Sequence, residues 1–235
     1  MQKFHKRRFD IITIFPEMIA PYTDASILGR AQKKGLLKIS AHNLRDWTTD
    51  KHHKVDDTPY GGGAGMLMKV EPFEKAVKEI KAQRTKRAQR VEKKIGEVPR
   101  PRVRVILTSA SGKLFTQKDA RRLAKYDQLI FLCGRYEGVD HRVKEHVVDE
   151  SLSIGNFVLT GGELPALVMI DAIARIVPGV LGSKESLESE SHDEEGLLEY
   201  PQYTKPEVYK KWKVPNVLLS GDHKKIEEWK KKNPR

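Results

Sequence analysis

Three short glycine-bearing stretches each follow a run of apolar residues, and they carry the residue types best suited to chemistry. They are SASGK at 109–113, CGRYEGVD at 133–140 and SIGNFVLTGGELPA at 153–166. Glycine lets a ligand contact backbone amides and carbonyls with no Cβ in the way. In an open α/β sheet, ligands bind beyond the carboxyl ends of the strands. Any one stretch alone reads as an ordinary turn, but the three together predict a ligand pocket.

A fourth glycine cluster, TPYGGGAGMLMK at 58–69, has four glycines within five positions. A phosphate-binding loop of the GxxxxGK[ST] type requires a lysine and a hydroxyl residue after its last glycine. Methionines occupy those places here, and the stretch at 109–113 lacks the upstream glycine and the final hydroxyl. No GxGxxG follows a strand-like run either. These patterns argue against a nucleoside triphosphatase and against an ordinary dinucleotide-binding domain.

The elements that must position these stretches alternate along the chain. Short apolar runs typical of strands are separated by stretches with helical periodicity, and nearly all-apolar strands between helices predict a parallel sheet covered on both faces. The fold class is therefore α/β. We expect strands at 9–15, 36–44, 102–110, 128–134 and near 150–155, and helices at 27–35, 71–95, 116–126, the start of 141–155 and 164–180.

The amino-acid composition indicates what kind of partner the protein binds and where it acts. Among 235 residues, 44 Lys and Arg face 32 Asp and Glu, giving a formal net charge of +12. This balance suits a polyanion such as nucleic acid, although a basic solvated surface explains it nearly as well. No apolar run reaches membrane-spanning length and no export signal opens the chain, so we expect a cytoplasmic protein without membrane contact. The single Cys133 excludes a disulfide framework and a cysteine zinc site.

A change in composition divides the chain. The segment SKESLESESHDEEG, which begins at Ser183, is acidic, rich in serine and nearly free of apolar residues. Such a segment is typical of a linker between domains. We therefore predict a domain at 1–182, a linker at 183–199 and a small helical domain at 200–235, which has room for two or three short helices.

Four long segments carry a family resemblance. TPYGGGAGMLMKVEPF, FLCGRYEGVDHRV, SIGNFVLTGGELPALVMIDAIARIVPGVLG and GLLEYPQYTKPEV with its continuation VPNVLLSGDH resemble, in order, the signature segments of the bacterial tRNA (guanine-N1)-methyltransferase family, TrmD. The resemblance implies a SPOUT-class methyltransferase whose parallel sheet is tied in a deep trefoil knot and which acts as a homodimer. The activity implied is methylation of N1 of the guanosine at tRNA position 37, immediately 3′ of the anticodon.

The resemblance also implies a pocket for S-adenosylmethionine inside the knot. Phe157 and Ala110 stand where members of the family often have tyrosine and proline. The positions that match the family's cofactor-binding residues lie in the three glycine-bearing stretches: Ser109, Gly134, Arg135, Tyr136, Glu137, Gly138, Ser153, Ile154, Gly155, Leu159, Gly161, Gly162 and Pro165.

The chemistry of the reaction defines two further roles. N1 of neutral guanine carries a proton, so a base must remove it while a cation or donor stabilises charge on O6. The family pattern gives the second role to Arg175 and the first to an acid in the linker. Glu190 is the matching acid, with Asp193 and His192 as alternatives, and a linker without any catalytic acid is the competing interpretation.

The resemblance further implies a requirement for Mg²⁺ and a tRNA-contacting role for Asp50 together with the lysines of the tail. Tyr209, Trp212 and Trp229 are candidates for stacking on bases, although packing of the small tail is the simpler expectation. Members of the family continue past the final EEWKKKNPR, so the tail is expected to be either naturally short or truncated. The alternative functions are a related knotted methyltransferase with another target nucleotide and an RNA-binding protein with impaired catalysis.

Overall fold

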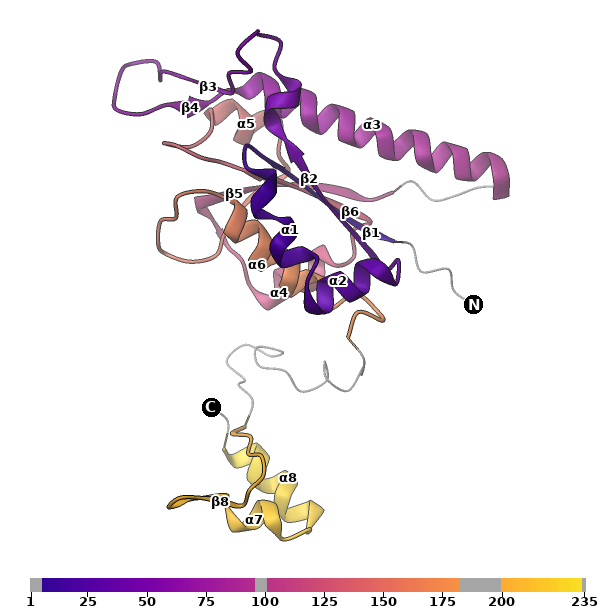
Figure 1. Ribbon diagram of the computed structural model, residues 1–235, viewed down its shortest axis with the longest axis vertical. Helices are drawn as coiled ribbons and strands as arrows, with labels where there is room; N and C mark the ends of the chain where they lie inside the picture. The colour runs from indigo at the N-terminus through magenta and orange to yellow at the C-terminus, as the bar shows by residue number, and fades with distance from the viewer. Residues whose placement is uncertain (1–5, 96–100, 182–199, 234–235) are drawn as a thin grey trace. The chain divides into compact units, whose positions relative to one another are not determined.

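The computed structural model describes residues 6–95, 101–181 and 200–233, with no side chain described from 85 to 95. The chain forms two compact units, residues 1–182 and residues 183–235, and each is described by itself. The larger unit contains the central sheet and most of the helices (Figure 1). The predicted linker at 183–199 lies outside the described residues.

The larger unit is built on a five-stranded sheet with the order β2-β1-β6-β5-β7. Every neighbouring pair of strands is parallel, as the apolar runs predicted. All six residues of β6 are buried, which explains why its sequence QLIFLC is apolar almost throughout. The strands are β1 (Arg7–Thr13), β2 (Leu37–Asn43), β5 (Val103–Leu114), β6 (Gln128–Cys133) and β7 (Glu150–Ser153).

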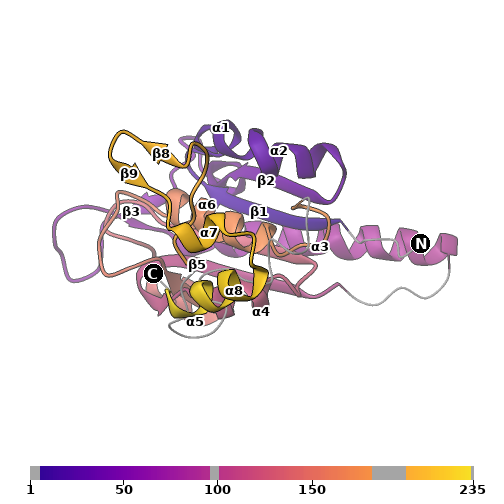
Figure 2. The same ribbon diagram turned by 90° about the horizontal axis from the view of Figure 1, so that it is seen from below.

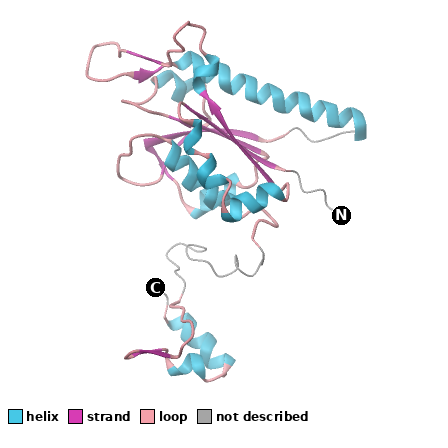
Figure 3. Cartoon of the chain, viewed as in Figure 1, coloured by secondary structure: helices cyan, strands magenta, loops and turns pink. Residues whose placement is uncertain are grey.

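Helices cover both faces of this sheet (Figure 3). On one face α2, α4 and α6 pack over a cluster that includes Phe9 and Phe131, and on the other α3 and α5 pack over a cluster that includes Ile12 and Leu132. The helix bounds are α1 (Ala20–Thr23), α2 (Ser26–Lys33), α3 (Val70–Ile95), α4 (Gln117–Leu123), α5 (His141–His146) and α6 (Glu163–Ala174), with 3₁₀ turns at Pro16–Met18 and Leu44–Trp47. No helix in the described part of the chain is both long and apolar enough to cross a membrane.

The cluster TPYGGGAGMLMK forms a hairpin that the sequence did not predict. Two short antiparallel strands, β3 (Asp56–Asp57) and β4 (Leu67–Met68), flank the glycines. Gly61, Gly62, Gly63 and Gly65 all have positive φ angles, a conformation that glycine adopts readily because it lacks a Cβ. The glycines therefore shape a loop, in keeping with the absence of a phosphate-binding motif.

The smaller unit contains two short helices, α7 (Asn216–Leu219) and α8 (His223–Lys232), within the predicted range. The side chain of Asp222 accepts a hydrogen bond from the Lys225 amide and so caps α8. A two-stranded hairpin, β8 (Val208–Tyr209) and β9 (Trp212–Lys213), precedes both helices and was missed in the sequence. Strands of two residues are too short to leave a periodic pattern.

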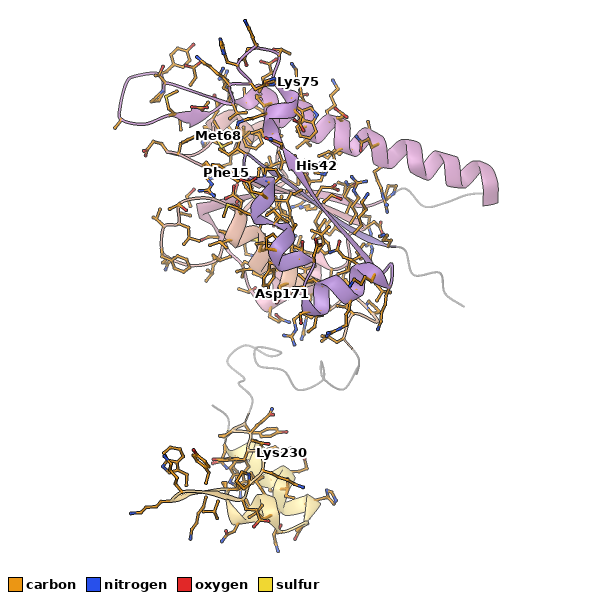
Figure 4. All side chains as sticks on the ribbon, viewed as in Figure 1. Phe15, His42, Met68, Lys75, Asp171 and Lys230 are labelled. Atoms are coloured by element: carbon orange, nitrogen blue, oxygen red, sulfur yellow. The ribbon has the colours of Figure 1, made fainter. Side chains whose placement is uncertain are left out.

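A buried carboxylate links three neighbouring strands of the sheet, β2, β1 and β6. Asp10 of β1 is fully buried and accepts hydrogen bonds from Arg8, Gln128 and His42, the last at 2.7 Å from Nε2 to Oδ1 (Figure 4). Burial alone would raise the pKa of Asp10, but the hydrogen bonds from His42 and Arg8 and the charge of Arg8 hold it below its ordinary value. Asp10 is therefore ionised in the folded state.

Asp10→Asn should lower the free energy of unfolding at pH 7 by roughly 3–5 kcal/mol, because it leaves the Arg8 charge without its buried partner. A carboxyl whose pKa is lowered by folding stabilises the protein above its unfolded pKa, near 3.8, and loses that contribution as the pH falls through the folded value. The difference between wild type and variant should thus shrink below about pH 4 in urea titrations. Asp57→Asn, at an exposed pair with Lys69, is the matched control. An Asp10→Asn effect of equal size at pH 7 and pH 3 would contradict this account.

Candidate functional site

A cavity of about 330 Å³ lies where the three glycine-bearing stretches meet, beyond the carboxyl ends of β6 and β7 and beside residues 107–111 of β5. Twelve of the thirteen residues predicted to bind a cofactor line it. Gly155 is the exception. It lies beside the cavity, where its amide donates a hydrogen bond to the Ser153 hydroxyl oxygen and where a Cβ would fall 2.3 Å from the Phe157 ring. The twelve lining residues are Ser109, Gly134, Arg135, Tyr136, Glu137, Gly138, Ser153, Ile154, Leu159, Gly161, Gly162 and Pro165.

Other residues of the same turns complete the lining. Sequence reasoning missed most of them because they carry apolar or hydroxyl side chains with no chemical signature of their own. Their adjacency to predicted site residues was the available signal. They are Leu107, Thr108, Ala110, Ser111, Val139, Leu152, Phe157, Val158 and Thr160.

The turn after β6 exposes its backbone to the cavity. The Gly138 amide donates to the Arg135 carbonyl, which closes a turn in which Tyr136 has a φ of 60° and Gly138 a φ of 126°. A positive φ is uncommon for a residue with a side chain, so tertiary contacts must hold Tyr136 in place. These contacts come from the glycine hairpin: the Glu137 amide donates to the Met66 carbonyl, and the Met68 amide to the Gly138 carbonyl.

The glycine hairpin therefore supports the cavity from behind. Gly65 has a φ of 83°, a conformation that favours glycine, and a Cβ there would fall 2.4 Å from the side chain of Glu137, which would then have to move. Met68 is fully buried in the same cluster against which Phe15 packs (Figure 4). The mechanical role of the hairpin is to hold the turn that carries Tyr136 and Glu137.

The loop that follows β7 passes through a tight gap. The Gly162 amide donates to the Gly134 carbonyl, and a Cβ on Gly162 would fall 2.0 Å from Thr108 Oγ1 and 2.8 Å from Cys133 Cα. The chain entering α6 thus passes between Thr108 of β5 and the end of β6 with no room for a side chain.

A buried ion pair anchors this loop. Glu163, at the start of α6, is 1% exposed; it accepts a 2.6 Å hydrogen bond from Thr13 of β1 and lies 3.1 Å from Arg135 Nε. Arg135 also donates to the Thr160 carbonyl and places its guanidinium 4.7 Å from the centre of the Phe15 ring. The Arg135 side chain therefore binds the loop, and Arg135 contributes mainly its backbone to the cavity wall.

Cys133, at the end of β6, is fully buried behind the cavity. Burial, and after it the charge of Glu163, raises the pKa of its thiol well above the ordinary value. Because the thiolate is the reactive form, Cys133 is not suited to act as a nucleophile. The single cysteine of the chain is part of the core.

Asp50 lies in an exposed loop, where its carboxylate accepts hydrogen bonds from the amides of His52 and Lys54. The Lys54 bond is the main cause of an Asp50 pKa below the ordinary value. The carboxylate therefore shapes its own loop, with Oδ1 and Oδ2 both turned toward the backbone.

Arg175 is not part of the cavity lining of this chain. It caps the end of α6 as an exposed residue, and helical spacing places it on the same face as Leu164, Val168 and Asp171. Leu164 and Val168 are 54% and 49% exposed. Glu190, Asp193 and His192, the candidate bases, lie outside the described residues.

Comparisons with known proteins agree on one kind of enzyme. The family model described as tRNA (Guanine-1)-methyltransferase TrmD matches residues 7–235. A tRNA (guanine-N(1)-)-methyltransferase from Dictyoglomus turgidum is 52% identical over 225 residues, which are 96% of this chain and 84% of the relative. Proteins of the same name from Dehalococcoides mccartyi strain 195 and Carboxydothermus hydrogenoformans are each 50% identical over 96% of this chain, and the matches cover 84% and 81% of those relatives.

Glu163→Ala should lower the free energy of unfolding by roughly 3–5 kcal/mol, because it leaves the largely buried Arg135 guanidinium without its ion-pair partner. Glu71→Ala is the control, since Glu71 forms an exposed pair with Lys75 in α3 and should cost less than about 1 kcal/mol. Urea titration followed by circular dichroism measures both. Equal costs for the two variants would show that the pair with Arg135 does not stabilise the fold.

Proposed function

The chain belongs to the tRNA (guanine-1)-methyltransferase family TrmD, and from this premise we propose that it transfers a methyl group from S-adenosylmethionine to N1 of the guanosine at tRNA position 37. The observation that carries the proposal is the convergence of the family's cofactor positions on one cavity. Twelve residues from three separate stretches line it together.

The cavity suits S-adenosylmethionine in size and chemistry. Its volume of about 330 Å³ falls within the range of small-molecule pockets. Its walls are largely the backbone of glycine-bearing turns, where side chains at Gly161 or Gly162 would collide with neighbouring atoms. Backbone amides and carbonyls can hydrogen-bond an adenine and a ribose, and Glu137 supplies the one acid of the lining, opposite in charge to a sulfonium. When bound, the cofactor supplies a methyl group activated by that sulfonium.

The residues of the protein would orient the guanine and remove the proton from its N1. Glu190 would accept the proton from N1, with Asp193 and His192 as the alternatives in the same segment. Arg175 would stabilise the negative charge that moves onto O6 as the proton leaves. The base thus acts at N1 and Arg175 at O6, the two ends of one amide-like group of guanine.

A homodimer accounts for the position of Arg175. The α6 face that carries Leu164 and Val168 is apolar and exposed in a single chain, and a second copy would cover it. Arg175 lies on that same face and away from its own cavity lining, so pairing of two chains would turn it toward the partner's site. This arrangement supports a dimer in which each site is completed by the other chain.

The tight passage of Gly162 between Thr108 and Cys133 supports a trefoil knot in the sheet. In a SPOUT fold, the chain after the last strand threads through a preceding loop, and here Gly162 lies in the gap between Thr108 of β5 and Cys133 at the end of β6. The domain plan we propose is a knotted methyltransferase domain at 1–182, a linker at 183–199 that carries the base, and a tRNA-binding domain at 200–235.

The remaining parts of the proposal follow from the substrate. Asp50 and the lysines of the smaller unit would contact the tRNA, since lysines against phosphates give affinity. The enzyme would act in the cytoplasm, where tRNA is processed.

We also propose a requirement for Mg²⁺. Among the described residues no group of three or more His, Cys, Asp or Glu side chains is placed to hold a metal, so the family relationship alone supports this point.

Methylation should be specific for the base. We expect labelled S-adenosylmethionine to mark a tRNA transcript with guanosine at position 37, in the presence of Mg²⁺, and not one with adenosine there, because only guanine offers an N1 proton beside O6. Scintillation counting of purified tRNA measures both. Labelling of neither transcript would refute the proposed activity, and equal labelling of both would refute its base specificity.

Glu190→Gln should abolish turnover and leave the binding of S-adenosylhomocysteine nearly unchanged, because an amide has no basic carboxylate but nearly the same size. Asp193→Asn is the matched control and should retain activity. Single-turnover kinetics and calorimetric binding separate the two effects. Full activity of Glu190→Gln together with loss in Asp193→Asn would move the base to Asp193.

A further inference from the structure

The aromatic residues of the smaller unit fall into two groups. Trp229 is partly buried, with its ring centre 6.5 Å from that of Tyr203, and Lys230 lies over the Tyr200 ring at 4.9 Å (Figure 4). These contacts hold the unit together, as the sequence suggested. Tyr209 and Trp212 differ, because their side chains are 55% and 70% exposed. The expectation that they pack the tail is wrong for this pair.

The hairpin presents these two rings side by side. Tyr209 and Trp212 are directly opposite each other in the β8–β9 pair, so they share one face, and their ring centres are 5.6 Å apart. Both Figure 1 and Figure 2 show the hairpin projecting away from α7 and α8. The rings therefore form an apolar platform that the core of their own unit does not use.

A lysine at the turn completes the platform. Lys210 has a φ of 59°, a left-handed conformation that a residue with a Cβ adopts at some energetic cost. Its ammonium lies 5.7 Å from the Tyr209 ring centre and 6.0 Å from that of Trp212. Lys211 follows it in the turn. The hairpin thus places cationic groups next to exposed aromatic rings.

The charge of the unit decides what kind of partner fits. Residues 200–233 contain nine lysines and four acidic residues. A nucleic acid offers both complements at once, since bases stack on aromatic rings and phosphates pair with lysines. A protein surface would need an apolar patch edged with acids to match the same face.

We propose that the hairpin face formed by Tyr209, Lys210 and Trp212 binds an unpaired base of the tRNA substrate. The base stacks on the exposed aromatic pair, and the neighbouring phosphate lies against Lys210 and Lys211. This inference rests on the proposed function, because it takes tRNA as the ligand. It gives the smaller unit a single-strand contact in addition to its general attraction for phosphates.

The test uses the full-length protein. Trp212→Ala should raise the Kd for tRNA between about 5-fold and 100-fold, the range found for loss of one base–aromatic stack, and leave the Kd for S-adenosylhomocysteine unchanged. Trp212→Phe should retain most of the affinity. Val208→Ala, in the same hairpin but on its opposite face, is the matched control and should bind tRNA like the wild type. Lys210→Gln should reduce the slope of log K against log salt by about one.

A second measurement needs no variant. In wild-type complexes, a series of transcripts with 2-aminopurine at one unpaired position each should show fluorescence quenching at the base that stacks. Wild-type tRNA affinity in Trp212→Ala, or no quenching at any unpaired position, would overturn the proposal. Loss of tRNA and S-adenosylhomocysteine binding together would show that Trp212→Ala damages the fold, and the quenching series on the wild type then decides. Methylation by the wild type is scored separately, so failure of the proposed function is distinguishable from failure of the hairpin contact.

Discussion

The buried carboxylate of Glu163 joins three parts of the chain that are far apart in sequence. Its hydrogen bond with Thr13 reaches β1, its contact with Arg135 reaches the turn after β6, and its own place at the start of α6 fixes the end of the loop from β7. A buried carboxylate is costly unless it is paired, so its partners are constrained as strongly as it is. The loop and the turn are two walls of one cavity, and this ion pair, together with the hydrogen bonds from Gly162 to Gly134 and from Arg135 to Thr160, holds them at a fixed distance.

The cavity is made of backbone held in place from outside. The Arg135 side chain is used on the loop, and the Met66–Met68 segment of the glycine hairpin holds the turn that carries Tyr136 and Glu137. Glycines at 65, 161 and 162 permit these close approaches because any side chain there would collide with a neighbour. A site of this kind selects its ligand by shape and by hydrogen bonds to the main chain. Few of its residues would look chemically active in isolation.

The two units offer a ligand different kinds of surface. The larger unit provides a cavity suited to a small cofactor, and the smaller unit provides an exposed, lysine-rich surface suited to a large anion. The aromatic pair at the tip of the β8–β9 hairpin would add base stacking to that surface. A small substrate pocket and an extended nucleic-acid contact have opposite requirements for burial, which is a physical reason to place them in separate units.

The sequence by itself determined the α/β class, the parallel sheet and the three turns that form the cavity, because apolar strands such as QLIFLC and the glycines that follow them leave local signals. It also identified the family, through long segments in order. Only the tertiary structure decided the uses of particular side chains. It turned Arg135 away toward Glu163, placed Arg175 on an exposed face beside Leu164 and Val168, and left Tyr209 and Trp212 outside the core. These outcomes depend on contacts between residues far apart in the chain, for which the local pattern of residue types carries no information.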